Sequence, residues 1–303
     1  MRGLVHSGGG RKGAWGVGVL KALTSRLKLD WPVLCGTSVG AINLSKIAMS
    51  PMGSAEDAVE ELEDMWLDLR TQDVWRHWFL GPLASLWRES FYNSKPLWVV
   101  LESELCEEAI LKSGRTLKVG CVDYRSGKYF EADPDLAVRN HVPWWKYVAA
   151  SSSYPGALLP VALPEGLCGD GGAISATPLK AAIDAGCNTI DVILTAPMNP
   201  KPMSLEDNRL GTKFNAIDIT LRTVDLLAHE AMVHDVRLCQ EINTLVRQGR
   251  DEKHREIQIH LYCPEKSLTS SPLDALNFDP KRTAELIKLG EKDALSYRPM
   301  GQT

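Results

Sequence analysis

The sequence has no excess of basic residues. Its 303 residues include 34 Lys and Arg against 38 Asp and Glu, so the formal net charge is -4. The basic residues are scattered along the chain and form no stripe. A protein that neutralises many phosphates needs a clustered cationic surface. The composition therefore argues against nucleic acid as a partner.

The sequence also lacks the cysteine spacing of a disulfide framework or a zinc site. Seven cysteines are present, an odd number, and none belongs to a C-x-x-C pair. Small disulfide-rich domains and structural zinc sites both depend on paired cysteines. We therefore expect reduced, mostly buried thiols, no metal site and no cofactor.

Long apolar runs are missing as well. No run approaches the 18 residues typical of a transmembrane helix. The first residues do not form the charged and then apolar pattern of a signal peptide. We expect a cytoplasmic protein, and secretion without a cleaved signal stays open.

What the sequence does have is enough apolar material for a sizeable core, with 44% hydrophobic residues. Strand-like and helix-like segments alternate as in an α/β fold built on a mostly parallel sheet. No internal repeat or clear linker divides the chain. We expect one domain over 1–303, with a candidate aromatic-rich cap or insertion at 71–93.

The hydrophobic pattern predicts individual elements. Strands are expected over residues 3–6, 31–35, 117–124, 128–131, 190–195 and 256–262. Helices are expected over residues 14–29, 39–49, 55–69, 96–111, 144–150, 178–185, much of 212–246, and 281–295. Asp279 and Pro280 are typical N-cap and first-turn residues for the last helix.

A serine between two glycines, Gly36-Thr37-Ser38-Val39-Gly40, joins a predicted strand to a predicted helix. A sharp turn at this point exposes a nucleophilic hydroxyl, and Gly36 and Gly40 remove side chains that would clash. The following helix directs its N-terminal N–H groups toward the same place. The alternative is that Ser38 only caps a helix.

A second glycine loop, Gly8-Gly9-Gly10, follows the first predicted strand. Backbone N–H groups in such a loop can stabilise the oxyanion that forms when a serine attacks an ester, and each donor contributes roughly 3 to 4 kcal/mol to the transition state. Parallel strands that follow one another usually lie side by side, so this loop and Ser38 should converge at one end of the sheet.

The same loop has a rival interpretation as a dinucleotide-binding turn. That site needs an acidic residue at the end of the second strand. The only nearby acid, Asp30, lies before that strand. A Walker loop is also excluded, because Lys12-Gly13 is in the wrong order. Nucleotide binding is therefore disfavoured.

The residue that activates Ser38 is not obvious. In an α/β-hydrolase a histidine follows the serine, and His260 could be proposed, but that fold places several strands before its nucleophile and here only one precedes it. His229, Glu230 and His234 have H-E-x-x-x-H spacing, which does not put the two histidines on one helix face. We expect these histidines to be structural.

Asp170 is a better candidate for the base. It lies in Gly169-Asp170-Gly171-Gly172, where glycines allow its carboxylate to approach other backbone closely. A plain Asp-Gly turn is the alternative.

Taken together, three motifs make the chain resemble the patatin-like phospholipases. They are, in order, the glycine loop 8–13, the serine turn 36–40 and the segment 170–172. The run 149–156 and the last helix extend the resemblance over about residues 2–297. The resemblance implies a three-layer α/β/α fold around a mostly parallel sheet.

The resemblance also implies a site and a reaction. Ser38 would be the nucleophile and Asp170 its base, with an oxyanion hole formed by Gly8, Gly9, Gly10 and Arg11. The remaining motif glycines are Gly13, Gly36, Gly40, Gly171 and Gly172. The family commonly has Asn six residues after the aspartate, where this chain has Ala176. The implied activity is metal-independent hydrolysis of lipid esters by a serine esterase.

An aspartate is a weak base at its reference pKa of about 3.9, so this mechanism requires burial that raises the pKa of Asp170. The alternative function is a non-catalytic lipid-binding or interaction module on the same fold.

Aromatic residues crowd the stretch 66–98, and indole rings favour membrane interfaces. They could form a lipid-facing cap that makes transient membrane contact, or they could be core or subunit contacts. Members of this group are Trp66, Trp75, Trp78, Phe79, Trp87, Phe91, Tyr92 and Trp98. Arg11 and Lys12 could attract a phosphate headgroup. The sequence determines neither headgroup, acyl position nor oligomeric state.

Overall fold

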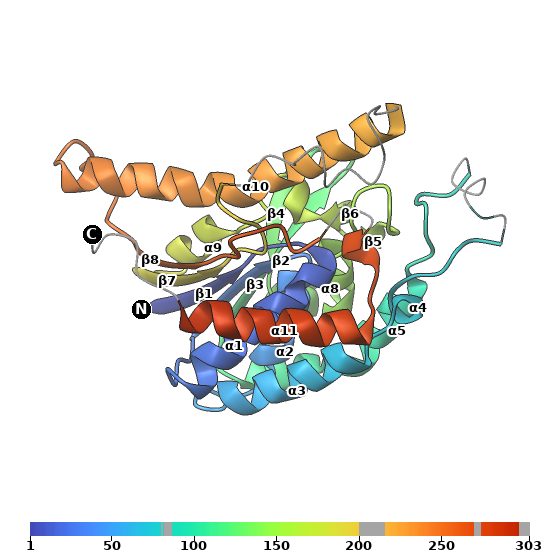
Figure 1. The fold of residues 1–303 in the computed structure, drawn as a ribbon, viewed down its shortest axis with the longest axis horizontal. Coiled ribbons are helices and arrows are strands. Elements are labelled where there is room, and N and C mark those ends of the chain that lie inside the picture. Colours follow the sequence, from blue (N-terminus) through green and yellow to red (C-terminus); the bar gives the residue numbers. More distant parts are fainter. Residues whose placement is uncertain (80, 82–86, 200–215, 270–273, 297–303) are drawn as a thin grey trace.

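The computed structural model describes residues 1–79, 81, 87–199, 216–269 and 274–296 (Figure 1). Residues 212–215 of one predicted helix, and residues 80 and 82–86 of the predicted insertion, lie outside these ranges. Within the described ranges, no helix is long and apolar enough to cross a membrane.

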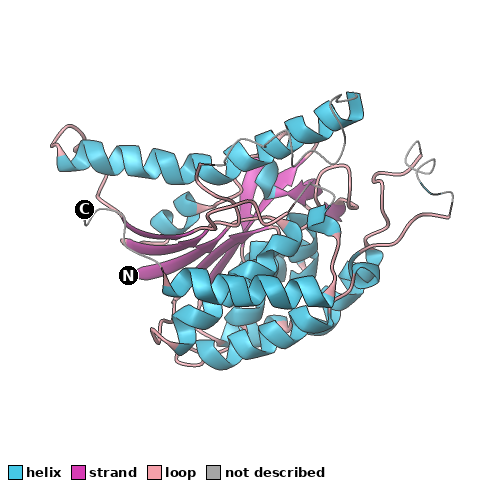
Figure 2. Cartoon of the chain, viewed as in Figure 1, coloured by secondary structure: helices cyan, strands magenta, loops and turns pink. Residues whose placement is uncertain are grey.

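A mixed, mostly parallel sheet runs through the molecule (Figure 2). Within the described residues it has eight strands in the order β5-β6-β3-β2-β1-β7-β8, and β4 pairs with β3. The strands are β1 (Arg2–His6), β2 (Val33–Thr37), β3 (Thr116–Asp123), β4 (Lys128–Ala132), β5 (Val161–Leu163), β6 (Gly166–Asp170), β7 (Thr189–Ile193) and β8 (Gln258–Tyr262). β1 and β2 are parallel neighbours, as the sequence predicts.

Helices cover both faces of this sheet, which gives three layers (Figure 1). One face is covered by α1 (Gly13–Ser25), α2 (Val39–Ala48), α3 (Ala55–Asp68), α8 (Trp144–Ser151) and α11 (Pro280–Leu295). The other face is covered by α9 (Leu179–Asp184) and α10 (Ala216–Arg247). The remaining α-helices of the described ranges are α4 (Thr71–Val74), α5 (Lys95–Glu104), α6 (Glu107–Lys112) and α7 (Pro134–Asn140).

The period of two along the central strands explains why two cores form. Leu4 and Leu34 face the α1 and α2 side, whereas Val5, Val33 and Cys35 face the α9 and α10 side. All five side chains are at most 1% exposed. A strand that is apolar on both faces is typical of a sheet covered by helices on both sides.

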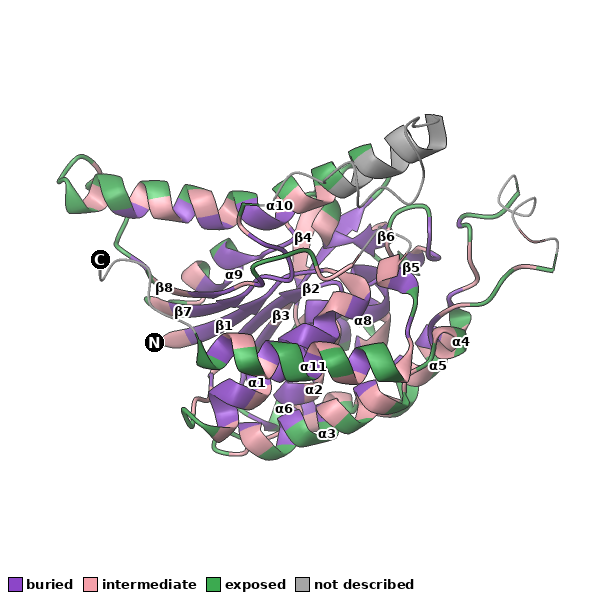
Figure 3. Cartoon of the chain, viewed as in Figure 1, coloured by how far each residue is buried: buried purple, intermediate pink, exposed green. Residues whose placement is uncertain are grey.

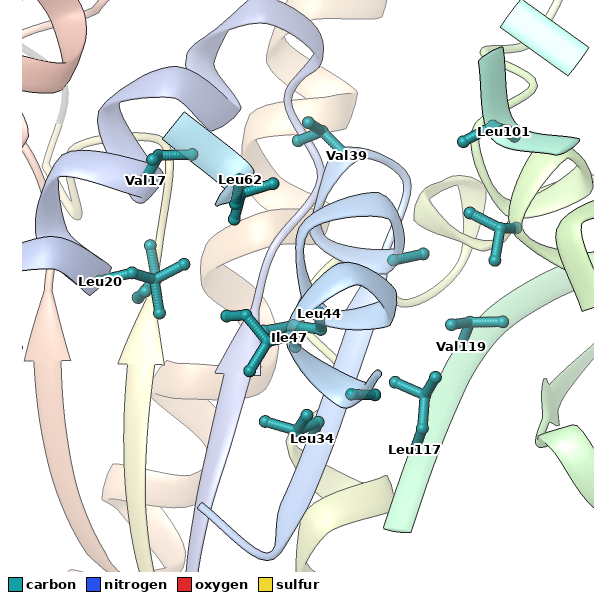
Figure 4. Close-up of a cluster of buried hydrophobic side chains, with 14 of the residues drawn as sticks. Val17, Leu20, Leu34, Val39, Leu44, Ile47, Leu62, Leu101, Leu117 and Val119 are labelled. Atoms are coloured by element: carbon teal, nitrogen blue, oxygen red, sulfur yellow. The ribbon is translucent and has the colours of Figure 1, made fainter. Parts of the chain in front are cut away.

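The larger core lies on the α1 and α2 side (Figure 4). Leu44 and Ile47 of α2 are completely buried with Leu34, Leu117 and Val119 of the sheet. In Figure 3 the buried colour is concentrated in the strands and in the helix faces turned toward them.

Most predicted elements are confirmed to within a few residues, and Asp279 caps α11 by accepting a hydrogen bond from Arg282 N at 3.0 Å. The single helix predicted over 96–111 is wrong, because extended backbone at Leu105 and Cys106 separates α5 from α6. The sequence analysis also missed α4, α7, β5 and β6. Strand β5 has only three residues and β6 is interrupted by glycines, so neither has a clear alternating pattern.

The seven cysteines are all free, and five of them are buried. This agrees with the expectation of reduced, mostly buried thiols.

Candidate active site

Ser38 lies at the turn between β2 and α2, with φ of 57° and ψ of -125°. A non-glycine residue in this region carries roughly 1 to 3 kcal/mol of backbone strain, which is typical of functional sites. Gly40 permits the turn, because a Cβ there would lie 2.1 Å from the carbonyl oxygen of His6. The local sequence thus forces Ser38 into a strained position against the end of β1.

Two serines at the end of α8 hold the backbone of Ser38. Its N–H donates to Ser151 Oγ at 3.0 Å, and Ser151 donates to the Gly120 carbonyl at 2.7 Å. Ser152 Oγ donates to the Ser38 carbonyl at 3.2 Å. Sequence reasoning gave these serines no individual role, although the serine run at 151–153 was the available signal.

The pairing register of β3 brings Ser38 and Asp170 together. Parallel β2 pairs with β3 up to Thr37 opposite Gly120, and antiparallel β6 pairs from Asp170 opposite the next residue, Cys121. Because β4 occupies the other edge of β3 at these positions, β2 and β6 lie on the same edge and meet end to end. The Ser38 turn and Asp170 therefore converge where two antiparallel strands end.

Asp170 is buried, with 3% of its surface exposed, and its Oδ1 accepts a hydrogen bond from Gly172 N at 2.7 Å. Burial raises the pKa of Asp170 to about 6, and the nearby Ser38 side chain and the Gly172 amide offset part of this rise. Close packing needs Gly171, because a Cβ there would lie 2.5 Å from the backbone of Gly120.

The glycine loop 8–10 lies against Ser38, since a Cβ on Gly8 would be 3.1 Å from Ser38 Cβ. The Gly8 N–H donates to the Ala176 carbonyl at 3.1 Å, so this amide is already engaged and does not fit the donor role the sequence predicts for it. Across the part of the chain that is described, the N–H groups of Gly9, Gly10 and Arg11 have no acceptor.

The side chain of Arg11 points into a buried ion pair. Its Nη2 lies 2.9 Å from Asp274 Oδ1, and the Arg11 side chain is 3% exposed. Burial lowers the pKa of this guanidinium, and Asp274 opposes that shift. Asp274 belongs to a short turn, 274–276, whose Ala275 carbonyl lies against Gly10. The Arg11 guanidinium therefore stabilises this turn through its ion pair with Asp274.

Ser38 and Asp170 both line a cavity of about 250 Å³. Gly9, Gly10 and Lys12 contribute to its wall. The rest of the lining is largely apolar and includes Val39, Ile42, Trp66, Leu101, Met232 and Phe278. A reacting ester beside Ser38 would therefore have apolar side chains around its acyl chain.

Helix α10 supports the loop that follows Asp170. Ser175 Oγ donates to Asp235 Oδ2 at 2.7 Å, and Thr177 Oγ1 donates to the Met232 carbonyl at 2.7 Å. Burial raises the pKa of Asp235. Between these two anchors, the Ala176 carbonyl holds Gly8, so the loop is supported although residue 176 is not Asn.

In the part of the chain that is described, His6 and His260 do not line the cavity that Ser38 and Asp170 share. Burial lowers the pKa of His6 to about 4, so the ring is neutral. Its Nδ1 lies 2.9 Å from the Ser7 carbonyl and its Nε2 lies 3.2 Å from Asn43 Nδ2. His260 is in the middle of edge strand β8, which β1 and β7 separate from β2. In the described ranges, no three His, Cys, Asp or Glu side chains are grouped in a way that could hold a metal ion.

The aromatic residues at 66–98 fall into separate groups. Trp66 is buried in the core and donates to Asn43 Oδ1 at 2.9 Å, and Trp98 packs near Trp145. Trp75 lies against Tyr92, with ring centroids 4.0 Å apart. Phe79, Trp87 and Phe91 are exposed.

The chain is similar to known proteins in structure and in sequence. The chain is similar to the crystal structure of VipD from Legionella pneumophila, with a TM-score of 0.44 and 14% sequence identity, over 97% of this chain and 66% of that chain, slightly less than two thirds of it. No curated protein matches the chain. A family model described as patatin-like phospholipase matches residues 4–183, more than half of the chain. The chain therefore belongs to the patatin-like phospholipase family.

Proposed function

We propose that this protein is a metal-independent lipid acyl hydrolase that uses Ser38 as nucleophile and Asp170 as base. The observation that carries the proposal is the convergence of Ser38 and buried Asp170 in one largely apolar cavity, where two strand ends meet beside β3. Family membership supports lipid esters as the substrate class. Such esters lie in bilayers or micelles, so the proposal includes transient contact with a lipid surface.

In the first half of the reaction, Ser38 Oγ attacks the ester carbonyl carbon while its proton passes to Asp170. The carbonyl oxygen becomes an oxyanion, which accepts hydrogen bonds from the amides of Gly9, Gly10 and Arg11. The intermediate then collapses and breaks the bond to the alcohol oxygen. Asp170 returns its proton to that oxygen, so the alcohol leaves neutral and the acyl group remains on Ser38.

In the second half, water replaces the alcohol. Asp170 takes a proton from the water as its oxygen attacks the acyl carbon, and the same N–H groups stabilise the second oxyanion. Collapse releases the fatty acid, and the proton on Asp170 returns to Ser38 Oγ. The two halves restore the enzyme without any other acid, base or metal.

The pKa of Asp170 makes this assignment chemically reasonable. At about 6, the group is ionised at neutral pH yet is a stronger base than an ordinary aspartate. The cause is burial, and the cavity that Asp170 lines has a largely apolar wall.

The direct test is fatty-acid release from mixed phospholipid vesicles in EDTA, with Ser38→Ala and Asp170→Asn as variants. We expect release from the intact protein and a loss of roughly 10⁴-fold or more in both variants. His260→Ala is the matched control and should keep full activity. Loss of turnover in EDTA, or in this control with folding intact, would contradict the mechanism.

A fluorophosphonate probe separates the hydrolase from a non-catalytic lipid-binding module. Only an activated serine reacts, so intact protein should be labelled and Ser38→Ala should not. Vesicle binding without labelling would favour the binding module instead.

A further inference from the structure

An aromatic segment extends away from the body of the molecule between α4 and α5 (Figure 1). We call residues 75–79 and 87–93 the aromatic projection. It carries three highly exposed rings, Phe79 at 102%, Trp87 at 75% and Phe91 at 56% exposure. Figure 3 shows that much of the projection is exposed. Soluble proteins rarely expose several large apolar side chains together without a binding role.

Residues 75–78 and 88–93 of the projection, which we call the stem, are joined by hydrogen bonds and a cation–π contact. Arg76 and Asn93 exchange two backbone hydrogen bonds of 3.0 and 2.9 Å. Trp78 Nε1 donates to the Ser90 carbonyl at 3.1 Å, and the Arg88 guanidinium lies 4.9 Å from the centre of the Trp78 ring. The stem therefore uses Trp78 internally while its neighbour Phe79 points to solvent.

The stem stands at the rim of the active-site cavity. Phe91 N donates to the Gly156 carbonyl at 2.8 Å, and Tyr92 N donates to the Ala157 carbonyl at 3.0 Å. These two acceptors lie between Pro155 and Leu158, which both line the cavity. Trp75 Nε1 donates to the carbonyl of Leu276, another lining residue, at 2.7 Å. The projection is thus attached to the cavity wall on two sides.

The charge of this segment differs from that of the whole chain. From Trp78 to Trp87 the sequence contains no charged residue. Within the projection lie Arg76 and Arg88 against one acid, Glu89, in a chain with a net charge of -4, and the flanking Asp73 and Lys95 have opposite charges. Exposed aromatic rings beside cationic side chains suit the region between lipid headgroups and acyl chains, especially in an anionic membrane.

We propose that the aromatic projection is a lipid-interface anchor, which inserts Phe79, Trp87 and Phe91 into an anionic membrane surface and holds the cavity rim against it. The proposal rests on the proposed function for the role of the cavity. Of the eight aromatic residues considered for the sequence-based cap, the anchor uses three, because Trp75 and Trp78 donate hydrogen bonds within the protein. A substrate would pass from the surface along the rim to Ser38 without crossing bulk water.

The test is co-sedimentation of the full chain with phosphatidylcholine vesicles, with and without phosphatidylglycerol. The variant is Phe79→Ser/Trp87→Ser/Phe91→Ser, and the matched control is Leu27→Ser/Leu295→Ser, which removes two other side chains, each 56% exposed. We expect the triple variant to bind roughly a hundredfold more weakly, since each inserted ring contributes to burial of apolar surface. The control should bind as the intact protein does.

Hydrolysis of a short, water-soluble ester distinguishes the possible outcomes. Weaker vesicle binding with unchanged hydrolysis of this ester supports the anchor. Unchanged vesicle binding overturns it, as does a dimer of the intact protein that the triple variant abolishes while vesicle binding is kept, because a second copy would then cover the rings. A loss of soluble-ester turnover with unchanged binding would make the rings part of the substrate site and would also overturn it.

Failure of the proposed function gives a different result. An intact protein that binds vesicles through the three rings but hydrolyses neither the vesicle lipids nor the soluble ester would refute the hydrolase and leave the anchor supported.

Discussion

Ser38 and Asp170 reach one cavity along opposite directions of the same edge of β3. The Ser38 arm, which we define as β2, the turn and α2, places its residue by backbone strain with φ of 57°. The Asp170 arm, β6 and residues 171–177, has ordinary backbone at its functional residue, with φ of -58°. Its functional residue is instead perturbed by burial, which raises the pKa of Asp170.

The difference shows that one site includes two kinds of unfavourable free energy, backbone strain and the burial of a charge. Ser38, the proposed nucleophile, is held in a conformation that most residues avoid, and Asp170, the proposed base, is held in an environment that disfavours its charge. Each of these unfavourable terms arises at a single residue, and the packing around the same sheet compensates for both. Substitutions that relieve one cost should leave the other unchanged.

The largest effect should come from adding a methyl group at the close contact in each arm. Gly40→Ala places a Cβ 2.1 Å from the His6 carbonyl oxygen, and Gly171→Ala places one 2.5 Å from Gly120. We expect each to lower the free energy of unfolding by about 3 kcal/mol or more. Urea denaturation measures this. Gly127→Ala, with φ of 69° and open surroundings, is the control and should cost about 1 to 2 kcal/mol. Equal losses in all three would contradict the close contacts.

Removing the charge of Asp170 should stabilise the protein at neutral pH. The pKa of about 6 in the folded protein exceeds the unfolded value, so stability falls as pH rises from below 4 to above 6, by up to about 3 kcal/mol. Asp170→Asn lacks this loss and should exceed the intact protein in stability at pH 8. The gain should shrink toward pH 4. Thermal unfolding at both pH values measures it, and a pH-independent gain would contradict burial as the cause.

The same pKa sets the acidic limit of catalysis. Asp170 must be ionised to accept the Ser38 proton, so turnover should fall about tenfold per pH unit below about 6, or roughly a hundredfold by pH 4. A soluble ester measured across this range tests the limit. A profile that stays flat down to pH 4 would exclude Asp170 as the base.

Relieving the backbone strain at Ser38 should raise the free energy of unfolding, whereas the same substitution at Asp170 should not. Ser38→Gly removes the cost of positive φ, so it should be about 1 to 2 kcal/mol more stable than Ser38→Ala. The equivalent pair at Asp170, Asp170→Gly and Asp170→Ala, should show the opposite order, because φ there is ordinary. Urea midpoints of the four variants decide this, and a less stable Ser38→Gly would refute the strain.

The smallest effect concerns the loop that faces Ser38. Asp274→Asn keeps an oxygen near Arg11 but removes the charge, so the loop that carries the amides of Gly9, Gly10 and Arg11 should be held less firmly. We expect kcat for a soluble ester to fall about threefold to tenfold with KM unchanged. Asp274→Glu should restore part of the rate. A change confined to KM would place the effect in substrate binding instead.

Much of the site could be predicted because its signals are local. The glycine loop 8–10 and the turn 36–40 are short, contiguous patterns, and they lie where the structure brings them together. Gly8 shows the limit of this reasoning. Its position in the loop was evident, but its amide is taken by Ala176, which is distant in sequence.

The Asp170 arm was harder to predict for a physical reason. Strand β6 is short, contains glycines and pairs with β3 antiparallel to β2, so neither its existence nor its direction follows from local periodicity. The roles of Ser151 and Ser152 depend in the same way on where α8 packs. For the aromatic stretch, composition marked the segment, but packing decided that Trp66 is core and Trp87 is exposed.

The turn at Ser38, the glycine loop 8–10 and the central strands that are apolar on both faces can be predicted from the sequence. Each depends on residues within a few positions of one another. Tertiary structure alone decided that Ser38 meets Asp170, that burial raises the pKa of Asp170, and that Arg11 pairs with Asp274. Those properties depend on which strand ends and turns lie side by side, and on how much water is excluded between them. That information is shared among residues more than a hundred positions apart.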